Sequence, residues 1–98
     1  MDRIQAMQIF IRVAEAASFV RAAKTLSLPS STVTTTIKKL EKYLKVRLFN
    51  RTTRQVSLTP EGLEYLTQCR EILSLIEHAE SSLTDSVSRP QGRLRVNM

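Results

Sequence analysis

Residues 18–44 constrain the fold most, because a short helical pattern and a longer one meet there across a proline. In the longer pattern, aliphatic residues recur at intervals of four, three and four, at Val33, Ile37, Leu40 and Leu44. This spacing marks one face of an α-helix. At about 100° per residue, the opposite face carries hydroxyl and ammonium groups, those of Ser31, Thr35, Lys38 and Lys42, with Lys45 just past the predicted end. Hydroxyls can bond base edges or phosphates, and lysines neutralise phosphates.

The break between the two helices is the sequence SLPSS. Pro29 disfavours helical backbone at Leu28, and Ser30 or Ser31 is expected to cap the second helix. Ser18 is expected to cap the first helix, whose inward side consists of Ala22, Ala23 and Leu26. Two helices across a tight turn, the second with a polar outer face, are typical of a helix-turn-helix. The alternative is an ordinary helical hairpin with a solvated basic face.

The charge is divided along the chain, which carries +6 in total. Residues 21–54 contain nine Lys or Arg against one acid, Glu41, whereas residues 55–88 contain one basic residue, Arg70, against six acids. A basic block beside an acidic block indicates one surface for a polyanion and another for something else. No helix pairs a basic face with an exposed aromatic face, so nucleic acid is favoured over a membrane surface.

Length and composition exclude several classes of protein. A chain of 98 residues forms one small domain that is marginal alone, so we expect a partner chain or a continuation. It has neither a transmembrane run nor a secretory signal. The single cysteine, Cys69, and the lone histidine, His78, form no metal cluster, and Gly62 and Gly92 cannot form a phosphate loop. We therefore predict a cytoplasmic protein without cofactor, metal or catalytic residues, which is not an enzyme.

The first helix is predicted over residues 2–17. Its apolar stripe has helical spacing and consists of Ile4, Met7, Phe10, Ile11, Ala14 and Ala17. Asp2 stands at its N-terminus, as a cap or as a charge at the positive end of the helix dipole. Phe10 and Phe19 lie among aliphatic neighbours and are read as core anchors rather than as stacking platforms for bases.

A two-stranded hairpin is predicted directly after the second helix of the motif. Val46 and Leu48, then Val56 and Leu58, alternate with polar residues, which is the spacing of a strand. The tip falls at residues 50–55 and carries two arginines, Arg51 and Arg54. Such a hairpin is the wing of a winged helix-turn-helix, and its arginines suit phosphates or a narrow minor groove. The alternative is a solvated loop.

A long last helix is predicted from Thr59-Pro60-Glu61, a threonine cap followed by proline and an acid in the first turn, to about Ser86. Gly62 weakens its first turn. A coiled-coil seam runs along it, at Tyr65, Cys69, Ile72, Ile76, Ala79 and Leu83, widened by Leu63, Leu66, Leu73 and Leu75. We expect this surface to pack against a second subunit; the alternative is that it covers another domain of the same chain.

The end of the chain reads as a hinge followed by the start of a strand. Residues 88–92 break the helix, and residues 93–97 alternate again. A lone strand has no sheet to join, so we expect the chain to be the N-terminal piece of a longer protein.

In this order, the elements resemble the N-terminal region of LysR-type transcriptional regulators over essentially the whole chain. The family's motifs LE-x-x-L, V-R-L-F-x-R and V-x-L-T-x-x-G occur in turn, starting at Leu40, Val46 and Val56. The resemblance implies a mainly α fold, with a winged helix-turn-helix over residues 1–59, a linker and dimerisation helix over 60–87, and a hinge with the start of an effector domain over 88–98.

The resemblance also implies a function. Linker helices of the family pack antiparallel to form dimers, which usually assemble into tetramers and bind interrupted inverted repeats of double-stranded DNA near promoters. An inducer bound by the effector domain changes transcription. The family's DNA-reading positions fall on Ser30, Ser31, Thr32, Thr34, Thr35 and Arg54. Lys38 of the same helix, with Arg51 and Thr53 of the wing, completes the expected DNA-binding set.

Three positions depart from the family pattern. Ser30 and Thr35 stand where the family often has glutamine and arginine, and threonine cannot read guanine bidentately. Lys45 stands where glycine is frequent, so a positive φ there costs about 1 kcal/mol. The cluster Thr32, Thr34, Thr35 and Thr36 is poor for helix stability, which suggests that it serves contact. The alternative function is an interaction module whose basic face binds a protein or RNA.

Overall fold

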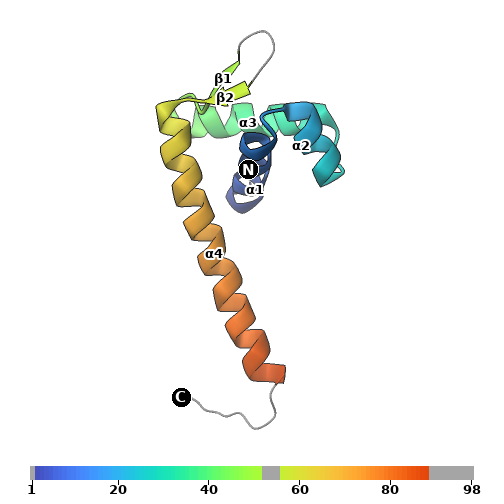
Figure 1. Cartoon of the computed structure of the whole chain (residues 1–98), viewed down its shortest axis with the longest axis vertical. Coiled ribbons are helices and arrows are strands. Elements are labelled where there is room, and N and C mark those ends of the chain that lie inside the picture. Colours follow the sequence, from blue (N-terminus) through green and yellow to red (C-terminus); the bar gives the residue numbers. More distant parts are fainter. Residues whose placement is uncertain (1, 52–55, 89–98) are drawn as a thin grey trace.

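The computed structural model describes residues 2–51 and 56–88. Three helices precede the wing, α1 (Arg3–Ala16), α2 (Phe19–Leu26) and α3 (Ser30–Leu44). The wing strands are β1 (Phe49–Arg51) and β2 (Val56–Leu58), and α4 (Pro60–Ser88) follows. Figure 1 shows α3 crossing behind α1, with the wing above it and α4 running down one side.

Side-chain caps define the first two helices as the sequence predicts. The Asp2 carboxylate accepts from the backbone N–H of Ile4 at 3.1 Å and of Gln5 at 3.2 Å. The Ser18 hydroxyl accepts from the N–H of Arg21 at 3.1 Å. These bonds satisfy N–H groups that have no partner within the helix. The caps therefore fix where α1 and α2 begin.

The predicted cap of α3 is wrong. The N-cap position is Pro29, which provides no side-chain bond, and Ser30 is already the first helical residue. The Pro29 carbonyl starts the helix instead, because it accepts from Thr32 N–H at 3.0 Å and Val33 N–H at 3.3 Å. The hydroxyls of Ser30 and Ser31 are consequently not used as the cap, and both residues are exposed.

The wing is shorter than the sequence pattern suggests. Antiparallel pairing joins Phe49 to Leu58 and Arg51 to Val56. Leu48 precedes the first strand and is buried, while Val46 lies in a bend with 38% of its surface exposed. The predicted start of the first strand was therefore three residues too early, because the chain must first turn away from α3. The predicted tip lies partly outside the described residues.

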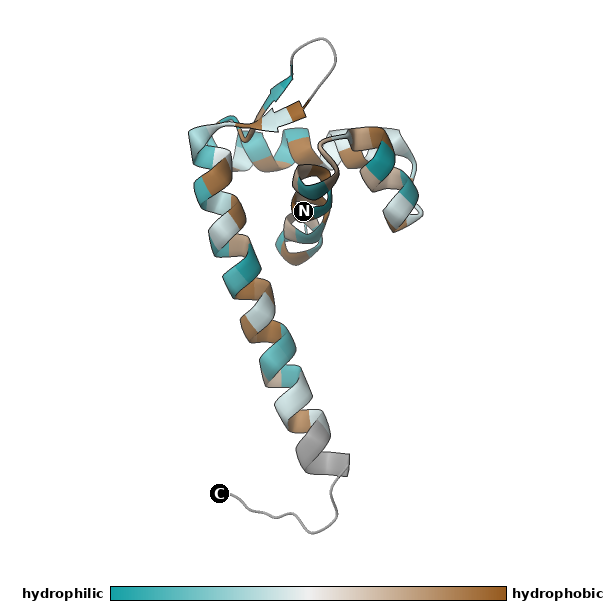
Figure 2. Cartoon of the chain, in the orientation of Figure 1, coloured by the Kyte–Doolittle hydropathy of each residue, from teal (hydrophilic) through white to brown (hydrophobic). Residues whose placement is uncertain are grey.

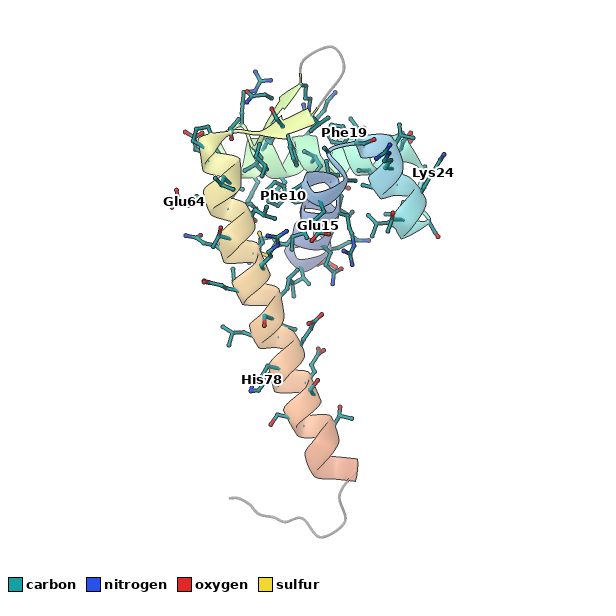
Figure 3. The ribbon with its side chains drawn as sticks, in the orientation of Figure 1. Phe10, Glu15, Phe19, Lys24, Glu64 and His78 are labelled. Carbon is teal, nitrogen blue, oxygen red and sulfur yellow. The ribbon has the colours of Figure 1, made fainter. Side chains whose placement is uncertain are left out.

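The core is centred on aromatic rings from four elements, α1, α2, β1 and α4. The Phe10 ring of α1 lies 5.2 Å from that of Phe49 and 5.2 Å from that of Tyr65, and Phe19 meets Phe49 edge-on at 5.9 Å. Figure 3 shows Phe10 between α1 and α4 and Phe19 near the wing. Tilted pairs at these distances are the favoured aromatic geometry. The prediction that Phe10 and Phe19 serve the core is confirmed.

The apolar stripe predicted for α1 is confirmed in part, because Phe10 is buried and Met7, Ile11 and Ala14 pack against the core. The buried residues of α1 are Ala6, Ile9, Phe10 and Val13, about a quarter turn from the predicted stripe. Ile4, the first residue of that stripe, keeps 46% of its surface exposed. Because α1 is apolar around most of its circumference, the packing of α2, α3 and α4 decides which side is buried, and helical spacing alone does not.

The last helix makes the molecule long. Its first half packs against α1 and its second half projects beyond the domain (Figure 1). The radius of gyration is 17.1 Å, whereas a compact chain of this length has about 13 Å. Figure 2 shows apolar residues continuing along the projecting half. This part of α4 has apolar surface that residues 2–51 and 56–88 do not cover.

Candidate nucleic-acid interface

The outer face of α3 carries the predicted hydroxyl and ammonium groups into solvent. Its exposed polar residues are Ser30, Ser31, Thr32, Thr35, Lys38, Lys39 and Lys42. Val33, Ile37 and Leu40 are buried on the opposite side. Thr34 lies between the two faces and is half-buried, so its hydroxyl is less accessible than that of Thr35. The helical assignment of the two faces is confirmed, while DNA contact by these residues stays a prediction.

A shallow hollow on this face adds one residue to the predicted set. Ser31, Thr32, Thr35 and Thr36 line the hollow together with Lys39. Sequence reasoning left Lys39 out, although it stands four residues after Thr35, the spacing at which helical side chains become neighbours. Lys39 therefore belongs with the groups that a polyanion on α3 would meet.

The helix before the turn adds further positive charge. Arg21 and Lys24 of α2 are exposed, and Figure 3 shows Lys24 at the outer side of α2. The turn itself is held by Ser27 in the left-handed conformation, φ 58°, and by Leu28 N–H donating to the Ala23 carbonyl at 2.9 Å. The basic surface thus extends from α3 across the turn to α2.

A left-handed residue also ends α3, at the position where glycine is frequent in the family. Lys45 has φ 61° and its N–H donates to the Glu41 carbonyl. A non-glycine residue pays about 1 kcal/mol for this conformation. The turn keeps the geometry that glycine would supply, and it exposes the Lys45 side chain.

One carboxylate joins α3 to the wing. Glu41 Oε2 accepts from the backbone N–H of Leu48 at 2.8 Å and of Phe49 at 3.3 Å, and Oε1 accepts from Arg51 Nη2 at 2.8 Å. The Arg51 guanidinium also lies 5.3 Å from the centre of the Phe19 ring, a cation–π distance. Arg51 was predicted as a DNA contact; the structure gives its guanidinium a role in holding the wing, and contact with DNA stays a prediction.

The other two predicted wing contacts, Thr53 and Arg54, lie outside the described residues. Their part in binding stays a prediction.

Two residues predicted for the dimer seam pack inside the domain instead. Cys69 is fully buried and Tyr65 lies against Phe10. Burial raises the pKa of the Tyr65 hydroxyl to about 12, with a further contribution from the neighbouring Cys69, and burial also raises the pKa of the Cys69 thiol. The prediction that Cys69 is an apolar packing residue fits this site, since thiolate reactivity needs a lowered pKa. Cys69 is therefore inaccessible in this arrangement, while Tyr65 is half-buried, and the assignment of the seam to a subunit contact stays a prediction.

The rest of the seam remains accessible. Ile72 is 39% exposed and Leu83 is 64% exposed, and Ala79 is exposed as well. Ile76 is half-buried and lines a groove of about 560 Å³ between α1 and α4, together with Ile4, Ile11, Leu26 and Leu73. The groove uses the side of α1 that the domain core leaves uncovered. His78 is exposed and projects from the side of α4 that faces away from α1 (Figure 3).

Neither a metal cluster nor a membrane-spanning helix forms in the described part of the chain. In residues 2–51 and 56–88, no three His, Cys, Asp or Glu side chains gather where they could hold a metal ion. Within the same ranges, no helix is long and apolar enough to cross a membrane.

The fold is that of the winged helix-turn-helix class of DNA-binding domains. It has the two helices α2 and α3, the antiparallel wing, and an exposed face of α3 that carries hydroxyl groups and lysines. A family profile described as "Bacterial regulatory helix-turn-helix protein, lysR family" matches residues 4–63. The chain belongs to the LysR family, whose members are transcription regulators and not enzymes.

Named relatives agree with this assignment. The chain is 45% identical over 97 residues to the HTH-type transcriptional repressor PA14_22550 of Pseudomonas aeruginosa. This match covers 99% of this chain and 31% of the relative. It is 41% identical over 98 residues to the uncharacterised HTH-type transcriptional regulator YhjC of Escherichia coli, covering 100% and 33%. The chain thus spans about a third of the length of these relatives.

Solved structures share the fold. The BenM_DBD/catB site 1 DNA complex matches with a TM-score of 0.85 and 28% identity, covering 88% of this chain and 96% of that one. Full-length CbnR complexed with its target DNA matches with a TM-score of 0.79 and 31% identity, covering 85% and 29%. The predicted fold class is confirmed.

Proposed function

We propose that this chain is a sequence-specific reader of double-stranded DNA, with α3 in the major groove and the wing on the backbone or in the minor groove. The single observation that carries the proposal is the outer face of α3, where hydroxyl groups and lysines are exposed together and no carboxylate is. An α-helix fits the major groove, and hydroxyls and ammonium groups serve base edges and phosphates there. Relatives of the same fold are described in complexes with DNA, which supports the proposal.

The reader acts as a dimer in this proposal, joined through the second half of α4, where Ile72 and Leu83 are exposed. A two-fold dimer presents two copies of α3 and so suits an interrupted inverted repeat. In the full-length protein, an effector-binding domain would follow α4, tetramers would form and the regulator would act on promoters in the cytoplasm. The acidic second half of α4 is unsuited to DNA, which supports its use between subunits.

Selection of bound sequences from a random duplex pool tests the proposal, with the 98-residue chain at moderate salt. Recovery of a spaced inverted repeat is the expected result, because two α3 helices read two half-sites. Binding that falls with salt and prefers no sequence would contradict sequence-specific reading by this chain. Recovery of single half-sites would contradict the dimer but would still support sequence-specific DNA binding by one subunit.

A separate class of function, an interaction module for protein or RNA, makes a different prediction. Such a module would bind duplex DNA without preference for sequence and would show a shallow dependence on salt. Competition between the selected duplex and a duplex of scrambled sequence distinguishes the two. Equal competition by both duplexes would favour the interaction module.

A further inference from the structure

Glu41 is unusual for its position, since it is the only acid in the basic segment of residues 21–54. It stands on the recognition helix α3, where a negative charge works against binding of a polyanion. Its side chain is nevertheless 13% exposed and is engaged through both oxygens. The negative charge of Glu41 opposes DNA binding, yet both of its oxygens accept hydrogen bonds. This combination indicates a role that a neutral side chain could not perform.

The bonds of Glu41 cross the boundary between two elements that would touch DNA. Oε2 holds the backbone N–H groups of Leu48 and Phe49, where the chain enters β1, and Oε1 holds the side chain of Arg51 at the end of β1. Arg51 in turn lies over the ring of Phe19, the first residue of α2. One carboxylate therefore links α3, the wing and, through Arg51, the start of α2.

The chemistry of these bonds requires a carboxylate. All three partners are N–H donors, and they approach both oxygens of Glu41. A carboxylate accepts at both oxygens, whereas an amide has one accepting oxygen and one donating NH₂ group. Glutamine of the same length would therefore turn a donor toward either the β1 backbone or Arg51. Hydrogen bonds to an ionised partner are also stronger than those between neutral groups.

We infer that Glu41 is a positioning residue that sets the orientation of the wing relative to the recognition helix, and through it the placement of the wing on DNA. Glu41 touches no DNA in this arrangement; it acts through β1. The inference deepens the proposed function and rests on it. It predicts that the wing, and not α3, loses its registration on the duplex when Glu41 is replaced.

The first test needs no DNA. In Glu41→Gln, amide hydrogen exchange at Leu48 and Phe49 should be faster than in the wild-type chain, by about tenfold for each 1.4 kcal/mol of lost protection. Exchange in the buried turn of α3 around Ile37 should stay unchanged. Glu64→Gln is the matched control, because it removes the same charge from an exposed position on the outer side of α4 (Figure 3). Unchanged exchange at Leu48 and Phe49 would overturn the inference whether or not the chain binds DNA.

The second test reads the wing on DNA, below the melting temperature of the variant. Selection from a random pool with Glu41→Gln should recover the same bases beneath α3 but lose preference in the flanking bases beneath the wing. Affinity for the selected duplex should fall about tenfold or more, the effect of one lost charge-assisted bond, while affinity for random duplex is unchanged or higher. Glu64→Gln should keep both preferences.

Each outcome of the second test separates the inference from the proposed function. If the wild-type chain selects no sequence, the proposed function fails and the inference about placement on DNA fails with it. If the wild-type chain selects a sequence and Glu41→Gln keeps the flanking preference, only the inference is overturned. A uniform loss of preference beneath α3 and the wing would also overturn it, because that pattern would indicate general loss of structure.

Discussion

At the scale of single residues, two segments of the chain approach each other closely at the start of α4. The Thr59 hydroxyl donates to the Arg47 carbonyl at 2.6 Å and accepts from Gly62 N–H at 2.9 Å. A Cβ on Gly62 would overlap the backbone oxygen of Leu48. The sequence suggested only that Gly62 weakens its helix. The structure shows that absence of a side chain lets the start of the wing lie against α4.

Gly62→Ala should therefore destabilise the chain even though alanine favours a helix. Overlap with backbone cannot be relieved by a side-chain rotation, so the expected net loss is about 1–3 kcal/mol in the free energy of unfolding. Thermal or urea unfolding measures it. Glu61→Ala, in the same turn but exposed, is the control and should change little. Equal stability of Gly62→Ala and wild type would contradict the close approach.

Burial of Tyr65 beside Cys69 gives stability a dependence on alkaline pH. The pKa of Tyr65 is raised to about 12 and that of Cys69 is raised as well, so above the ordinary values of these groups the folded chain keeps protons that the unfolded chain releases. Their contribution is full below about pH 8, where neither state loses the protons, and it is lost as the pH rises toward 12.

The melting temperature should consequently fall above about pH 8, and the fall should be shallower in Tyr65→Phe, by several degrees between pH 10 and 12. Phenylalanine keeps the ring against Phe10 and removes only the titrating hydroxyl. Tyr43→Phe removes a hydroxyl from a tyrosine that is 56% exposed and serves as the control. Melting curves of the three proteins from pH 7 to 12 provide the comparison, and parallel curves for Tyr65→Phe and wild type would count against this prediction.

At the scale of elements, the sequence predicted what local chemistry determines. Caps at Asp2 and Ser18 and the two faces of α3 follow from neighbouring residues, and the structure has them. The buried side of α1 and the burial of Cys69 depend on partners far along the chain. The pattern of α1 allowed several faces, and the seam of α4 continued without a break into the domain core. Periodicity could not reveal where one surface ends and the other begins.

The threonine face of α3 predicts a separation of stability from binding. Thr35→Ala should leave the melting temperature equal or higher, because alanine is the better helix former, while affinity for the selected duplex falls. Loss of one hydroxyl hydrogen bond to a base costs about 0.5–1.5 kcal/mol, or roughly two- to tenfold in affinity. Thr67→Ala on α4 is the control, since Thr67 is also an exposed helical threonine. Binding curves and thermal unfolding curves of both variants measure the effect. Unchanged affinity in Thr35→Ala would contradict the proposed contact between Thr35 and DNA.

The seam of α4 predicts the positions at which an introduced charge should cause the dimer to dissociate. Leu83→Glu should weaken the dimer at least a hundredfold, because burial of one leucine contributes about 1.5–3 kcal/mol and two-fold symmetry counts it twice. Ser81→Glu is the control, since Ser81 is also exposed but lies about 160° away around the helix. Sedimentation equilibrium measures the dissociation constants. A stronger effect of Ser81→Glu would place the subunit contact on the other side of α4.

At the scale of the whole molecule, charge and shape divide the chain into two parts. The basic groups of α2 and α3 lie on the domain, while the acids from Glu71 to Asp85 follow the projecting half of α4. The resulting extent of 57 Å along one axis separates the two surfaces. The sequence predicted this division from the order of its charges alone. The sequence could not predict the hydrogen bonds of Glu41 to Leu48, Phe49 and Arg51, because these residues approach Glu41 only after the wing has folded back onto α3.

Salt dependence tests the molecule as a whole. If each subunit neutralises about four phosphates, a bound dimer releases counterions from about eight, and log K should fall with log salt at a slope near −7. Lys38→Gln removes one exposed cation from each copy of α3 and should make the slope shallower by about 2. Arg70→Gln removes a cation that binds Glu15 on the side of α4 at 3.2 Å and should leave the slope unchanged. A slope altered by Arg70→Gln and not by Lys38→Gln would place the DNA against α4, and the proposed orientation of the whole domain would then be wrong.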